Sequence, residues 1–208
     1  MKNVRFFLLF LTFGLATVVF SSCSKDDDPK HFDEGVVING VKWATRNVAA
    51  PGTFAAKPED AGLFYQWNRK TAWPATGEIA GWDSNVPSGD AWEKVNDPCP
   101  VGWRVPTFAE IQKLLDINKV SSEWVTQNGI AGRKFTDKVT GHNIFLPAAG
   151  CRYFYDGALY DVGSYGRYWI STVVGSGDAY YLYFDSGYAY RGYGYHSFGR
   201  SVRAVAEY

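Results

Sequence analysis

Tyrosine is concentrated in the last part of the chain, and its spacing there favours binding over catalysis. Thirteen of the fourteen tyrosines follow Cys151, and the exception is Tyr65. Tyrosine combines a rigid ring with a hydroxyl and loses little side-chain entropy when it is ordered, so recognition surfaces are rich in it. The run from Tyr188 to His196 alternates tyrosine with glycine, alanine and arginine. We expect these rings to project, largely accessible, from a loop or hairpin and to bind a ligand beside Arg191 and His196.

The same composition allows a second interpretation. A β-sheet can be rich in tyrosine without binding a ligand, if protein groups or water satisfy the hydroxyls. The segment 178–185 is such a strand candidate, with an aromatic residue at nearly every position. Alternation along a strand places Tyr180, Leu182 and Phe184 on one face, and Tyr181 and Tyr183 on the other.

Residues that could carry out enzymatic chemistry are few. The three histidines, His31, His142 and His196, lie in unrelated contexts, and the chain has no HExxH, CxxC, Walker-loop or GxSxG motif. Acidic residues do not cluster at metal-ligand spacing after Asp28. The sequence therefore predicts no catalytic residue, no metal and no cofactor, and an enzyme remains only a remote alternative.

The N-terminus has the pattern of an export signal. Lys2 and Arg5 precede an apolar stretch over residues 6–20, which is too short and wrongly flanked for a stable membrane span. Small residues then precede Cys23, and this tripeptide resembles the lipobox of bacterial lipoproteins. The resemblance implies that the Cys23 thiol is lipidated and becomes the new N-terminus, so that outer-membrane lipid is a partner through Cys23.

An acidic run follows the cysteine. Asp26 to Asp28 resembles the surface-export tag of lipoproteins in the Bacteroidetes, and physically it is a solvated linker that holds the domain away from the bilayer. We therefore expect a signal peptide over 1–22, a lipid anchor and acidic linker over 23–35, and one domain over 36–208. The expected location is the outer membrane, facing the cell exterior.

Charge and length limit the partners and the architecture. Cleavage before Cys23 removes Lys2 and Arg5, so the formal net charge falls from 0 to −2. A nearly neutral chain argues against nucleic acid as a partner, because nucleic acid selects basic surfaces. The remaining length suits one domain with a single sizeable core. High glycine and aromatic content favours many short strands joined by tight turns.

Two local signals predict particular elements. Apolar runs flank Asn39-Gly40, the strongest short hairpin turn signal, so residues 36–43 are expected to form a hairpin. Thr107 and Glu110 have capping-box spacing, which predicts a helix near residues 107–117. The apolar stripe of that helix, which we interpret as core, is Phe108, Ile111, Leu114 and Leu115.

Four spaced segments resemble one protein family. They are 96–107 followed by Glu110, 145–152, 166–172 and 199–205. Together they resemble the Fibrobacter succinogenes major paralogous domain, which is common in lipoproteins of gut Bacteroidetes. The resemblance implies a single α+β domain of the C-type-lectin-like fold, in the branch of formylglycine-generating enzymes, with a twisted antiparallel sheet and long loops. The copper chemistry of those enzymes needs a cysteine near the C-terminus, and no cysteine follows Cys151 here.

The C-terminal stretch also resembles the variable region of proteins that are diversified by retroelements. In those proteins a lectin-like scaffold displays changeable, tyrosine-rich side chains. With this resemblance, the predicted ligand-binding residues are Tyr153, Tyr155, Tyr165, Arg167, Tyr188, Tyr190, Arg191, Tyr193, Tyr195 and His196.

The two cysteines of the domain leave one question open. An envelope protein meets oxidising conditions, so Cys99 and Cys151 are a candidate disulfide. The family often has a cysteine where this chain has Ala204, which puts the bridge in doubt. The function we expect is a surface recognition domain that binds a glycan or protein ligand. The alternative is a structural or adhesin-type envelope component with no small ligand.

Overall fold

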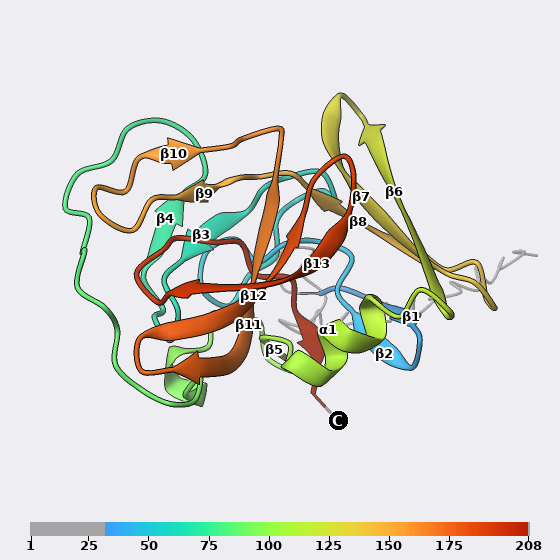
Figure 1. Ribbon diagram of the computed structural model, residues 1–208, viewed down its shortest axis with the longest axis horizontal. Coiled ribbons are helices and arrows are strands. Elements are labelled where there is room, and N and C mark those ends of the chain that lie inside the picture. The colour runs from blue at the N-terminus through green and yellow to red at the C-terminus, as the bar shows by residue number, and fades with distance from the viewer. Residues whose placement is uncertain (1–31, 208) are drawn as a thin grey trace, which may run out of the picture.

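A computed structural model of the chain describes residues 32–207 (Figure 1). The predictions for the signal peptide, for lipidation at Cys23 and for most of the acidic linker lie outside the described residues. Between residues 32 and 207, no helix has the length and apolar character of a membrane span.

The described part of the chain is built almost wholly from β-strands. It holds fourteen strands in five separate sheets, one 3-10 turn, η2 (Lys94–Asn96), and one α-helix of seven residues, α1 (Phe108–Leu114). The expected α+β, C-type-lectin-like class is therefore wrong, and the fold is all-β. The predicted helix is present, but it has only two turns. The chain turns at Asp116 and enters a long hairpin at Val120.

The strands are distributed unevenly among the sheets. A four-stranded sheet has the order β1 (Val36–Ile38), β2 (Val41–Trp43), β14 (Val205–Ala206), β5 (Trp103–Arg104). Two antiparallel sheets have three strands each. The first is β6 (Val120–Gln127), β7 (Ile130–Asp137), β8 (Asn143–Pro147), and the second is β11 (Gly166–Gly175), β12 (Asp178–Phe184), β13 (Ala189–Tyr195). Two pairs complete the set: β3 (Leu63–Tyr65) with β4 (Ala72–Pro74), and β9 (Cys151–Arg152) with β10 (Leu159–Tyr160).

The first hairpin and the helix start are confirmed. Asn39 and Gly40 both have positive φ, at 46° and 74°, as the tight turn between β1 and β2 requires. Thr107 caps α1, and the capping box with Glu110 is complete. Ile111 and Leu114 are buried in the core.

The sheet β11–β13 lies in the middle of the molecule, with β6–β8 on one side and the pairs β3–β4 and β9–β10 on the other (Figure 1). Two buried clusters pack against the opposite faces of β11 and β12. Leu182 and Phe184 join the cluster that includes α1, β1 and β8, whereas Ala179 and Trp169 join the cluster built around Tyr65 and Trp103. The predicted division of β12 into two faces is therefore confirmed. Strand β13 is the edge of the sheet, and its first residue, Ala189, packs against the first cluster.

Cys99 and Cys151 are free thiols, so the structure contains no bridge between them. Burial raises the pKa of each thiol. Cys99 packs beside the cluster around Trp103, and Cys151 lies near Arg167, whose Nη1 approaches the sulfur to 3.5 Å.

Candidate functional site

The two faces of β13 differ in what they present. Residues 190, 192 and 194 lie on the same face as Tyr181 and Tyr183, because Tyr190 pairs with Tyr183 and Gly192 with Tyr181. Residues 189, 191 and 193 lie on the other face, and Tyr195 is the last residue of the strand, where its ring contacts Phe154. The tyrosine-rich strand therefore divides its side chains between two surfaces.

Five side chains gather on the first of these surfaces. Tyr183 is at the centre, with ring centroids 4.7 Å from Tyr190, 5.4 Å from Tyr165 and 6.2 Å from Tyr188. The guanidinium carbon of Arg167 lies 5.1 Å from the Tyr165 centroid and 5.7 Å from the Tyr183 centroid. We call this group, Tyr165, Arg167, Tyr183, Tyr188 and Tyr190, the tyrosine cluster.

One ion pair and several turn hydrogen bonds fix the tyrosine cluster in place. Arg167 Nη2 lies 2.7 Å from Asp161 Oδ2, so this guanidinium already has a carboxylate partner. Asp185 Oδ1 accepts hydrogen bonds from the backbone N–H groups of Gly187 and Tyr188, and its Oδ2 accepts one from the Tyr183 hydroxyl. Burial raises the pKa of Tyr183, and the Asp185 carboxylate adds to the shift. The Tyr183 hydroxyl therefore stays protonated and donates.

A cavity of about 460 Å³ adjoins the tyrosine cluster. It lies between β6, the loop before β11 and the turn that joins β12 to β13. Its lining combines aromatic rings with short polar side chains: Trp124, Gly163, Ser164, Tyr165, Asp185, Ser186, Gly187 and Tyr188. Tyr165 and Tyr188 belong both to the cavity wall and to the tyrosine cluster, so the two form one surface.

A second aromatic group lies at the far end of the sheet. Phe154 is in ring contact with Tyr153 at 4.6 Å, with Phe198 at 5.1 Å and with Tyr195 at 5.2 Å. Tyr160 joins through Tyr153, at 5.0 Å. We call this group, Tyr153, Phe154, Tyr160, Tyr195 and Phe198, the aromatic corner.

Arg200 connects the two groups. Its guanidinium carbon lies 3.8 Å from the Tyr181 centroid, 4.1 Å from Trp169 and 4.6 Å from Phe198. Tyr181 neighbours Tyr183 on one face of β12, and Phe198 belongs to the aromatic corner. We call the chain of contacts from the tyrosine cluster through Tyr181 and the buried Arg200 to the aromatic corner the aromatic face.

Four of the ten predicted residues are not part of the aromatic face. Arg191 and Tyr193 lie on the opposite face of β13, where the Arg191 guanidinium stacks 5.1 Å from Phe108 and a separate hollow of about 590 Å³ opens. Tyr155 is 73% exposed, in the turn between β9 and β10. His196 is fully buried, stacks on Trp67 at 4.1 Å and contacts the Pro87 carbonyl through Nδ1. The expectation that His196 lines an accessible site is therefore corrected: the chain turns inward directly after β13.

Several residues of the aromatic face were missed from the sequence. The alternation along β12 had already separated Tyr181 and Tyr183 from the core side, and this signal was sufficient to include them. Phe154 and Phe198 are isolated in the sequence, and their contacts join β9, β10 and the segment after β13. Arg200 has no local signal, because its neighbours Trp169 and Tyr181 come from other strands.

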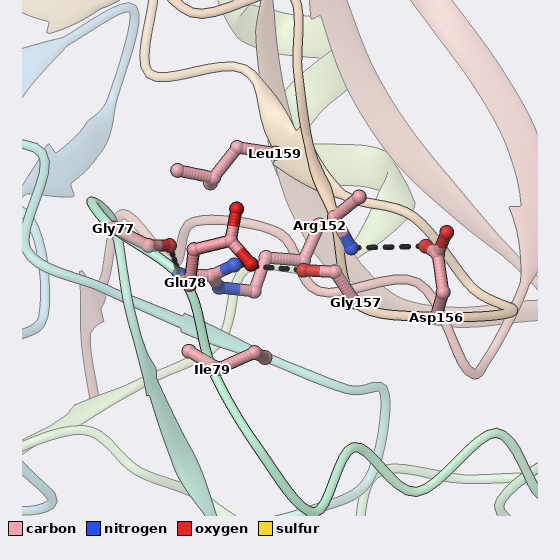
Figure 2. A pocket seen from close by; sticks show the side chains of 8 residues that line it. Gly77, Glu78, Ile79, Arg152, Asp156, Gly157 and Leu159 are labelled. Carbon is pink, nitrogen blue, oxygen red and sulfur yellow. Dashed lines mark hydrogen bonds between the residues drawn. The ribbon is translucent and has the colours of Figure 1, made fainter.

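A further hollow with a charged lining, about 540 Å³ in volume, is formed by loop residues near Arg152. Figure 2 shows the Arg152 guanidinium bonded to the carbonyls of Gly77 and Gly157. Its remaining bonds go to the carbonyls of Pro74 and Thr76. This cation clamps two loops together and has no donor group directed at a ligand.

Within residues 32–207, no group of three or more His, Cys, Asp or Glu side chains is arranged to hold a metal ion. The expectations of no metal, no cofactor and no enzymatic activity stay predictions.

The part of the chain that carries the aromatic face matches a known protein family. Residues 113–205 match the family described as "Domain of unknown function (DUF8237)". No curated protein and no solved structure matches the chain. The matched span runs from α1 to β14 and so includes both the tyrosine cluster and the aromatic corner. The resemblance to the Fibrobacter family stays a prediction.

Proposed function

We propose that this protein is a carbohydrate-binding domain, displayed on the outer membrane by the lipid on Cys23, and that the tyrosine cluster is its binding site. The observation that carries the proposal is the joint surface of the tyrosine cluster and the adjoining cavity. Three of its rings, Tyr165, Tyr188 and Tyr190, have hydroxyls with no hydrogen-bond partner among the described residues, and Tyr188 and Tyr190 are 57% and 43% exposed.

The chemistry of this surface suits a sugar. A sugar has C–H groups on the faces of its ring and hydroxyls around its edge. The electron-rich faces of aromatic rings attract the C–H groups, while Ser164, Ser186 and the free tyrosine hydroxyls offer hydrogen bonds to the hydroxyls. The cavity is open and its lining is mixed, unlike the mostly apolar pockets that enclose drug-sized ligands. An extended, polar chain of sugars matches this shape better than a compact apolar molecule does.

The two faces of β13 provide a matched test. The full-length protein, in detergent micelles, is applied to a glycan array, and binding is compared for Tyr188→Ala/Tyr190→Ala and for Tyr193→Ala. Tyr193 is 66% exposed and lies on the same strand, but on the face away from the tyrosine cluster. Loss of one central aromatic residue of a binding site costs about 2 kcal/mol or more, which is about 25-fold in affinity, and the double variant is expected to lose at least this much. Tyr193→Ala is expected to bind like the wild type.

Thermal melts of the same proteins separate binding from stability. Both variants remove exposed rings, so we expect melting temperatures close to that of the wild type. If the double variant loses many degrees, the cluster is a part of the core and the recognition proposal is wrong. If the wild type binds no glycan, carbohydrate is the wrong ligand class, and a protein ligand or a purely structural role replaces it. If all three proteins bind a glycan equally, the tyrosine cluster is not the binding site.

A further inference from the structure

Arg200 differs from the other buried arginines in having no acceptor. Arg203 donates to Asn47 Oδ1 and to the carbonyls of Ala44 and Phe145, and Arg152 has four carbonyl partners. Arg200 is 2% exposed, makes no ion pair with any described residue, and has two nitrogens, Nε and Nη1, that are buried without a hydrogen-bond partner. Buried cations are normally paired, because an unpaired charge loses its hydration without compensation.

The rings around Arg200 compensate for part of this cost but not for the missing acceptor. Tyr181, Trp169 and Phe198 supply cation–π attraction. Burial lowers the pKa of Arg200 to about 10, so the guanidinium is still charged at neutral pH. The aromatic face therefore holds two guanidinium groups that differ in their partners. Arg167 forms an ion pair with Asp161, whereas Arg200 has no carboxylate partner among the described residues.

Gly194 leaves space for a ligand atom beside the Arg200 guanidinium. A Cβ atom built on Gly194 would lie 2.9 Å from Arg200 Nη2, which is the distance of a hydrogen bond. Because residue 194 is glycine and half-exposed, that position is not filled by its own side chain. The Tyr181 ring borders the same position, at 3.7 Å. An oxygen placed there would accept from Nη2 and lie against an aromatic ring.

We propose that Arg200 is an anion subsite of the aromatic face and that the ligand is an acidic oligosaccharide whose carboxylate occupies the space beside Gly194. This inference rests on the proposed carbohydrate function and names the sugar class. Tyr190 and Gly194 are four residues apart on β13, or about 13 Å along a strand. A ligand that stacks on the tyrosine cluster and also reaches Arg200 must therefore be longer than one sugar ring.

The test compares acidic polymers with their neutral counterparts. The full-length protein is titrated with polygalacturonate, alginate and hyaluronan, and with the carboxyl-reduced form of each, in which the carboxylate has become a hydroxymethyl group. A hydrogen bond to a charged group contributes about 1.5–3 kcal/mol. The wild type is therefore expected to prefer at least one acidic polymer over its reduced form by at least about tenfold. A sulfated dextran in the same series shows whether the subsite takes any anion or selects carboxylate.

Two variants locate the preference. Arg200→Met removes the charge while keeping much of the side-chain volume. Gly194→Ala keeps the charge of Arg200 and places a methyl group in the proposed carboxylate position, 2.9 Å from Nη2, so that the end of the Arg200 side chain must shift slightly. Both are expected to lose the preference for the acidic form and to keep the binding of the reduced form. Gly175→Ala is the control, because nothing lies within 4 Å of a Cβ at that strand position.

The outcomes separate this inference from the proposed function. If the wild type binds acidic and reduced polymers equally, or if both variants keep the acidic preference, Arg200 is a structural cation and the inference is wrong while carbohydrate binding stands. If Arg200→Met does not fold, Gly194→Ala alone decides between these results. If the wild type binds neither form of any polymer, the carbohydrate proposal fails and this inference fails with it.

Discussion

Gly166 offers a direct test of how the central sheet is built. This glycine begins β11, pairs with Phe184 of β12, and lies beneath the Phe184 ring. A Cβ at residue 166 would come well inside 3.0 Å of three ring carbons of Phe184, and contacts that close essentially never occur. Phe184 is fully buried, so its ring has little freedom to move away. The Gly166→Ala variant therefore forces either the ring or the strand to shift.

The expected cost follows from the geometry. Overpacking a core usually costs about 1–3 kcal/mol, and a clash with three ring atoms belongs at the upper end. Replacing glycine by alanine also restricts the unfolded chain, which returns about 0.4–1 kcal/mol. We therefore expect a net loss of about 2 kcal/mol, or a fall in melting temperature of roughly 4–8 °C for a chain of this size.

Two further variants make the measurement specific. Gly175→Ala changes the other end of the same strand, where nothing lies within 4 Å of the new methyl group, and should be neutral or slightly stabilising. Phe184→Leu makes room above residue 166, so the double variant Gly166→Ala/Phe184→Leu should be more stable than the sum of the two single changes predicts. Urea unfolding followed by tryptophan fluorescence gives the free energy of unfolding of the wild type and of each of the four variants. A Gly166→Ala protein within about 0.5 kcal/mol of the wild type would refute the packing of β11 on Phe184.

Two other predictions test the polar contacts that begin α1 and close the turn after β7. Thr107→Ala removes the hydroxyl that accepts a hydrogen bond from the Glu110 N–H, and should lower the free energy of unfolding in urea by about 1 kcal/mol. Thr107→Ser keeps the hydroxyl and should cost much less. Equal losses of stability in the two variants would contradict the cap. Asp137 accepts from the backbone N–H groups of Asn39, Val139 and Thr140, and these bonds lower its pKa from 3.8 to about 2. Its stabilising effect should be fully present above pH 4 and lost as the pH falls towards 2, so Asp137→Asn should be less stable than the wild type at pH 7 and approach it in acid. A difference that stays constant with pH would refute that account.

Local signals predicted the elements that local interactions determine. The turn at Asn39-Gly40 and the capping box at Thr107 depend on a few neighbouring residues, so the sequence was sufficient for both. The same turn signal occurs at Asn128-Gly129, where both residues have positive φ, and it marks the long hairpin β6–β7. It was overlooked because β6 is largely exposed and has no apolar run beside the turn. Recognising it would have predicted two long strands directly after the short helix.

The composition of the candidate site was predicted better than its arrangement. The sequence already contained the information needed to divide the tyrosines between two faces. Side chains alternate along a strand, so Tyr190 and Tyr193, three positions apart, must lie on opposite faces. The prediction of a loop or hairpin did not assign the run to one strand, and so this division into two faces was not made. Arg200 was beyond reach from the sequence, because its surroundings come from residues far away in the chain, and only the folded structure shows that its acceptor is missing.

The glycines of β13 show why tyrosine content alone does not identify the binding surface. A Cβ at Gly192 would lie 2.7–2.8 Å from the end of the Tyr181 ring, and one at Gly194 would lie 2.9 Å from Arg200. On this face the small residues therefore leave room for a ring and a cation that belong to other strands, and they do not serve as flexible joints. A strand that only needed soluble, exposed tyrosines would have no reason to hold a charged group unpaired beneath a glycine. That unpaired cation costs folding free energy, and an anion bound beside Nη2 would offset part of this cost.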